Sequence, residues 1–138
     1  MTLKIKTLQD AKQACLNGSV RGLAWQGWER SLGPTPAMIS GCALNGLNGR
    51  HCAIGWLIPP RKFNPQIAGA NGVLKEGLLP TPIMKWFRLQ PKEEQGIFRL
   101  FCVDLMMNHD LSGSPHEMHS AFRKMAESHK LTWPKGVQ

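Results

Sequence analysis

The stretch PKEEQGIFRLFCVDLMMNH, residues 91–109, carries the clearest helix signal in the chain. Pro91 suits the first position of a helix, because the N–H that proline lacks would have no partner there. Apolar residues then recur at helical spacing, and one face is expected to hold Ile97, Leu100, Phe101, Asp104, Leu105 and Asn108. Because Phe98, Cys102 and Met106 extend this apolar surface, the helix is predicted to be central and mostly buried.

Shorter helices are expected on both sides of this stretch, where capping residues precede periodic apolar runs. Thr7 and Asp10 have the spacing of a capping box, and Gly18 stands where a helix commonly ends. The predicted helices cover about 8–17, one or two turns near 73–79, about 82–89, and the residues that follow Ser114-Pro115.

The segment between these helices is predicted to form a β-hairpin near residues 39–57. Asn48-Gly49 is a strong tight-turn dipeptide, because both residues tolerate positive φ. The apolar run 52–58 is typical of a buried strand, although a short helix after Cys52 has the same pattern. The sequence therefore predicts an α+β fold, in which about five helices pack on a hairpin within a single domain, 1–138.

The bulk composition restricts the class of protein. Hydrophobic residues make up 42% of the chain and charged residues 19%, a mixture that argues against disorder. The sequence contains neither an apolar run long enough for a membrane span nor a secretion signal, so we expect a cytoplasmic protein without a membrane partner. The net charge of +8 favours anionic partners, such as nucleic acid or an acidic protein surface.

A nucleophilic cysteine is one hypothesis for function. Cys52 follows a turn and could begin a helix, whose N-terminus would stabilise a thiolate. His116 and His119 are candidate bases for a hydrolase or transferase. The alternative is that Cys52 packs in the core, and the sequence favours no catalytic assignment.

A zinc site is a weaker hypothesis. Cys42 and Cys52 could meet across the hairpin, and His116 and His119 have the spacing of ligands on one helix. The chain has no Cys-x-x-Cys pair, and these two halves lie far apart in sequence. We therefore predict neither a metal nor a cofactor.

Aromatic and basic residues are interleaved along the chain, a pattern that suits single-stranded nucleic acid. The rings belong to Trp25, Trp28, Trp56, Phe63 and Trp86, and the cations to Arg21, Arg30, Arg61, Lys62, Lys85 and Arg88. The alternative is that the rings fill the core and the cations face water. The predicted binding residues are those of the basic loop and its surroundings: Arg50, Arg61, Lys62, Phe63, Lys85 and Arg88.

Two segments carry a resemblance to a known group. Gly41-Cys42-Ala43 with the run from Asn48 to Pro59, and the tail Ala126-Glu127-Ser128-His129-Lys130-Leu131, resemble motifs of a family of uncharacterised bacterial and phage proteins. This chain departs from the family at 60–63, where Pro-Arg-Lys-Phe replaces acidic residues and Tyr. The resemblance implies a phage or mobile-element origin in a host bacterium. We therefore favour a non-enzymatic accessory protein, such as an inhibitor, that binds a host protein or nucleoprotein complex, with a single-stranded nucleic-acid binder as an alternative.

Overall fold

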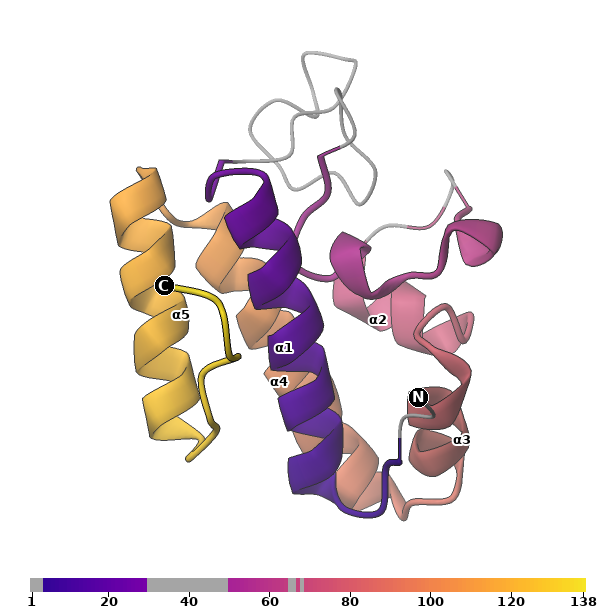
Figure 1. Cartoon of the computed structure of the whole chain (residues 1–138). Helices are drawn as coiled ribbons and strands as arrows, with labels where there is room; N and C mark the ends of the chain where they lie inside the picture. Colours follow the sequence, from indigo (N-terminus) through magenta and orange to yellow (C-terminus); the bar gives the residue numbers. More distant parts are fainter. Residues whose placement is uncertain (1–3, 30–49, 65–66, 68) are drawn as a thin grey trace.

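The computed structural model describes residues 4–29, 50–64, 67 and 69–138 (Figure 1). Over these residues the chain forms five α-helices and two short 3-10 helices, and no strand. The elements are α1 (Leu8–Trp25), η3 (Gly55–Leu57), η4 (Pro60–Lys62), α2 (Gly69–Lys75), α3 (Thr81–Arg88), α4 (Lys92–Asp110) and α5 (Pro115–Ser128).

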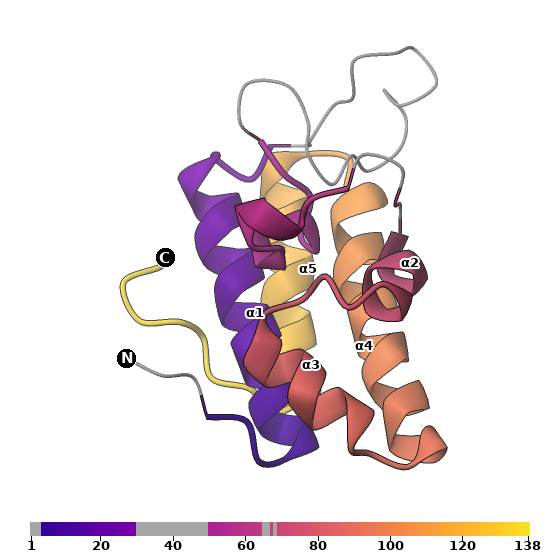
Figure 2. The same ribbon diagram turned by 90° about the vertical axis from the view of Figure 1, so that its right-hand side faces the viewer.

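Helix α4 is central, because α1, α2 and α5 all pack against it. Helix α1 lies along α4, with α5 on one side of this pair and with α2 and α3 on the other (Figures 1 and 2). The short η3 packs on α1. One cluster of buried apolar side chains joins these elements, and its largest fully buried members are Phe98, Phe101 and Phe122.

The predicted α+β fold is wrong, since the described part of the expected hairpin is not a strand. Residues 55–57 form η3, and residues 39–49 lie outside the described residues. The polar backbone groups of residues 53–55 find hydrogen-bond partners within the same segment and on α1. The Gly55 N–H donates to Cys52 Sγ at 3.3 Å, and the Ser19 hydroxyl donates to Ala53 O at 2.7 Å. A buried apolar run therefore needs no partner strand here.

Helix α1 begins as predicted and continues far beyond the predicted end. Thr7 and Asp10 form the capping box, and the Lys6 and Thr7 N–H groups lower the pKa of the Asp10 carboxyl. Gly18 does not end the helix, because η3 packs on this face: a Cβ at Gly18 would lie 2.6 Å from Leu57 Cδ2. The helix ends instead at Trp25 with Gln26 as its C-cap, and Gly27 follows with a φ of +74° that permits the bonds closing the last turn.

Helix α4 starts one residue later than predicted, at Lys92 with Pro91 as its N-cap, and its buried face is rotated from the predicted one. The buried residues are Phe98, Phe101, Cys102, Leu105 and His109. Ile97, Leu100 and Asp104, which we expected on the buried face, are exposed. The pKa of Cys102 is raised well above its ordinary value by a hydrogen bond with Cys15 of α1 and by burial, so Cys102 stays a thiol.

The end of α5 offers a test of backbone strain. Lys130 has a φ of 57°, a left-handed conformation that glycine adopts more readily, and Leu131 N–H donates to Ala126 O at 2.7 Å. We expect Lys130→Gly to raise the free energy of unfolding by about 1 kcal/mol in urea denaturation. The control Lys124→Gly, in the middle of α5, should lower it by about 1 kcal/mol. A loss of stability in Lys130→Gly would contradict this account.

Candidate aromatic and basic surface

Four aromatic rings form a row at the C-terminal end of α1, in which each ring contacts the next. The ring centroids of Trp25 and Trp56 are 5.7 Å apart, those of Trp56 and His51 4.5 Å, and those of His51 and Phe63 5.4 Å. We call Trp25, Trp56, His51 and Phe63 the ring row. Its members come from α1, η3 and the segments that flank η3 and η4, so packing of residues 50–63 on α1 assembles the row.

Gln26, the residue that caps α1, holds the ring row in place. It is 6% exposed, and its Oε1 accepts from Trp56 Nε1 at 2.9 Å and from His51 N at 3.0 Å. Its Nε2 donates to His51 O at 3.0 Å and to Glu29 O at 2.6 Å. One buried amide therefore links the end of α1 to the Trp56 ring and to the backbone of His51, and no pattern in the sequence predicted this role.

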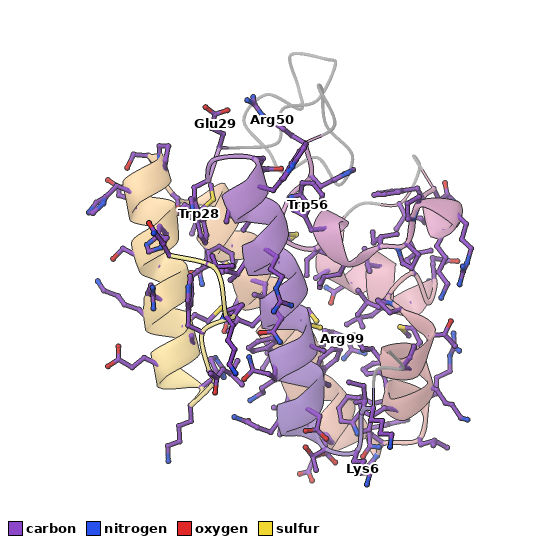
Figure 3. All side chains as sticks on the ribbon, viewed as in Figure 1. Lys6, Trp28, Glu29, Arg50, Trp56 and Arg99 are labelled. Atoms are coloured by element: carbon purple, nitrogen blue, oxygen red, sulfur yellow. The ribbon has the colours of Figure 1, made fainter. Side chains whose placement is uncertain are left out.

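A hollow of about 400 Å³ lies beside the ring row. It is lined by Trp25, Gln26, Gly27, Glu29 and Arg50. The Arg50 guanidinium forms an ion pair with the Glu29 carboxylate, and Figure 3 shows this pair beyond the end of α1, with Trp28 and Trp56 on opposite sides of the helix. The hollow thus combines one aromatic wall with a hydrogen-bond donor and an acceptor.

A second hollow, of about 390 Å³, shares the ion pair with the first. It is lined by Trp28, Glu29, Arg50, Ser112, Gly113, Ser114, Pro115 and Met118. The Trp28 ring packs edge-on to His119, with centroids 4.8 Å apart, and lies parallel to Trp133. These contacts fix Trp28 against α5 and the C-terminal segment. Arg50 and Glu29 therefore stand between two hollows.

The predicted binding residues lie in different surroundings. The Lys62 ammonium donates to Leu79 O at 3.0 Å and reaches Thr81 Oγ1 at 3.4 Å, which ties η4 to the start of α3. Arg88 lies against the turn between α2 and α3. Its Nη2 is 2.5 Å from the position that a Cβ would take on Gly77. Arg61 and Lys85 are exposed, Phe63 belongs to the ring row, and Arg50 borders both hollows.

Arg21 and Trp25 belong to the interleaved aromatic and basic residues but not to the predicted binding residues. Both are exposed on α1, and Trp25 keeps 73% of its surface accessible. Their spacing of four residues places them on one face of a helix. This shared face exists only because α1 extends past its predicted end at Gly18.

No contact within the described residues joins the candidate nucleophile Cys52 to His116 or His119. Cys52 is fully buried, with its sulfur accepting from the Gly55 N–H. His119 contacts Trp28, Trp133 and the carbonyl of Gln138, and His116 is exposed at the start of α5. These contacts account for Cys52 and His119 as packing residues.

The zinc hypothesis falls partly on Cys42, which lies outside the described residues. Among the residues that the structure does describe, no three His, Cys, Asp or Glu side chains are gathered as metal ligands would be.

His129 lies elsewhere, between α4, α5 and α1. Burial and the nearby Lys12 ammonium lower the pKa of His129, so this imidazole is neutral at neutral pH.

Comparisons with protein-family models, curated proteins and solved structures find no match. The resemblance to bacterial and phage proteins therefore stays a prediction, and the phage, host-interaction and inhibitor assignments have no support beyond it. Within the described residues, no helix has the length and apolar character needed to cross a membrane. The described residues define a helical protein whose most distinctive surface is the ring row with its neighbouring arginines.

Proposed function

We propose that this chain is a non-enzymatic binding protein that attaches to an anionic macromolecule through the ring row and its flanking arginines. The observation that carries the proposal is the exposure of Trp25, 73% accessible at the open end of the row. Large aromatic side chains dominate the energetics of macromolecular interfaces. An indole that stays in water at the edge of a hollow is therefore well placed to meet a partner.

Charge supports an anionic partner. The net charge of +8 draws anions toward the protein over a long range. Arg21 is exposed one helical turn before Trp25, and Arg61 is exposed two residues before Phe63, so cations stand near both ends of the ring row. The cytoplasmic location predicted from the sequence belongs to this proposal, since nucleic acids and nucleoprotein complexes are available there.

The proposal is tested by retention on immobilised heparin, a polyanion without aromatic bases. The variant Arg21→Ala/Arg61→Ala is compared with Lys92→Ala/Lys135→Ala, which removes the same charge from exposed positions on α4 and the C-terminal segment. We expect the arginine variant to elute at clearly lower salt, with the slope of log K against log salt reduced by about 2. Equal elution of the two variants would overturn the proposal, because binding would then follow net charge alone.

A further inference from the structure

We infer that the anionic macromolecule is a single-stranded nucleic acid, and that one of its bases stacks on Trp25 with its edge in the hollow lined by Glu29 and Arg50. This inference rests on the proposed function and names the partner of the same surface.

The Trp25 ring is held in place without being covered. Its contact with Trp56 is close to perpendicular, with an interplanar angle of 73° and centroids 5.7 Å apart. Trp56 is itself fixed by its hydrogen bond to Gln26. A ring that is oriented by its neighbour and still largely accessible is pre-organised for stacking, which lowers the entropy lost on binding.

The hollow beside Trp25 has room for the edge of a planar base. Its volume is about 400 Å³. Gly27 leaves its wall open, since nothing lies within 4 Å of the position that a Cβ would take. Arg50 pairs with Glu29 Oε2, so Glu29 Oε1 is the oxygen that can accept from an N–H on the edge of a base, such as the imide N–H of thymine.

Stacking distinguishes a single strand from a duplex. In a duplex the faces of the bases are covered by their neighbours, whereas a single strand can turn its bases onto protein rings. Arg21 lies one turn along α1 from Trp25, and Arg61 lies near the other end of the row at Phe63. A short extended strand laid along the row would therefore bring phosphates to both arginines.

The test is fluorescence anisotropy with labelled oligo(dT) of about 12 nucleotides, a duplex of the same length, and unlabelled heparin as competitor. We expect oligo(dT) to bind more tightly than the duplex. Trp25→Ala should weaken oligo(dT) binding about 10-fold, within the range measured for loss of one stacked base. Trp25→Phe should retain most of the affinity, and heparin retention should not change in either variant. Thermal unfolding is the control for folding, because Trp25 is exposed and its removal leaves the core intact.

Two results separate this inference from the proposed function. If oligo(dT) binds no better than duplex and Trp25→Ala binds it as well as the parent protein does, the single-strand inference is overturned. A selective loss of heparin retention in Arg21→Ala/Arg61→Ala would then still support an anionic partner. If that loss is also absent, both proposals fail.

Discussion

Gln26→Leu is expected to lower the free energy of unfolding by about 3 kcal/mol, although leucine has a similar size. The Gln26 amide is 6% exposed and makes four hydrogen bonds, two to the backbone of His51, one to the Trp56 indole and one to Glu29 O. Leucine leaves these part-buried donors and acceptors without a partner, and each unsatisfied group costs about 1 kcal/mol or more.

The same substitution should also disturb the ring row, because Trp56 and His51 lose the group that orients them. We expect a change in the near-ultraviolet circular dichroism of the tryptophans and weaker binding of oligo(dT). The control is Gln95→Leu on α4, since Gln95 Nε2 makes a single bond, to Phe87 O at 2.8 Å. That variant should lose about 1 kcal/mol and keep the spectrum. If urea denaturation shows equal losses for both variants, Gln26 is not the residue that holds the row.

Gly22→Ala is expected to destabilise the protein by about 2 kcal/mol, the reverse of its usual effect inside a helix. The Cβ of alanine would overlap the five-membered ring of the Trp56 indole, since its position lies 2.2 Å from Cγ and Cδ2 of that ring. Trp56 cannot yield freely, because Gln26 holds its indole N–H and Trp25 and His51 contact its ring. The variant should therefore displace η3 from α1.

Gly96→Ala is the matched control, since Gly96 lies inside α4 with nothing within 4 Å of the position of a Cβ. It should gain up to about 1 kcal/mol from helix propensity alone. Urea denaturation of the two variants compares their free energies of unfolding. Gly22 is a glycine on which a distant segment packs, and Gly96 is not. Stabilisation of both variants would mean that Trp56 does not lie on Gly22.

Helix starts could be predicted from the sequence because their determinants lie within one turn. Thr7 and Asp10 bond each other's backbone, the Ser114 hydroxyl accepts from Glu117 N at 3.1 Å, and Pro91 precedes α4. These interactions act between residues three or four positions apart and need no tertiary partner. For the same reason, about five helices could be expected without knowing how they pack.

The buried face of α4 could not be predicted from the sequence. Apolar residues surround much of this helix, so periodicity left its orientation open. Packing against α1, α2 and α5 buries Phe98, Cys102 and Leu105 and leaves Leu100 in water. The same holds for the candidate site. The arginines near the ring row could be named from the sequence. The role of Gln26 could not, because its partners lie 25 and 30 residues away.

The sequence by itself determined where helices begin, that the chain is basic, and that aromatic and basic residues are interleaved. Only the tertiary structure decided how far α1 extends, that residues 55–57 form a helical turn instead of a strand, and that Trp25 meets Trp56. The physical reason is that Gly18 and Gly22 have low helix propensity alone, but without side chains they let residues 52–57 approach α1 closely. The energy of that packing depends on residues far apart in sequence, such as Ser19 and Ala53, which are 34 positions apart, and local propensity does not contain it.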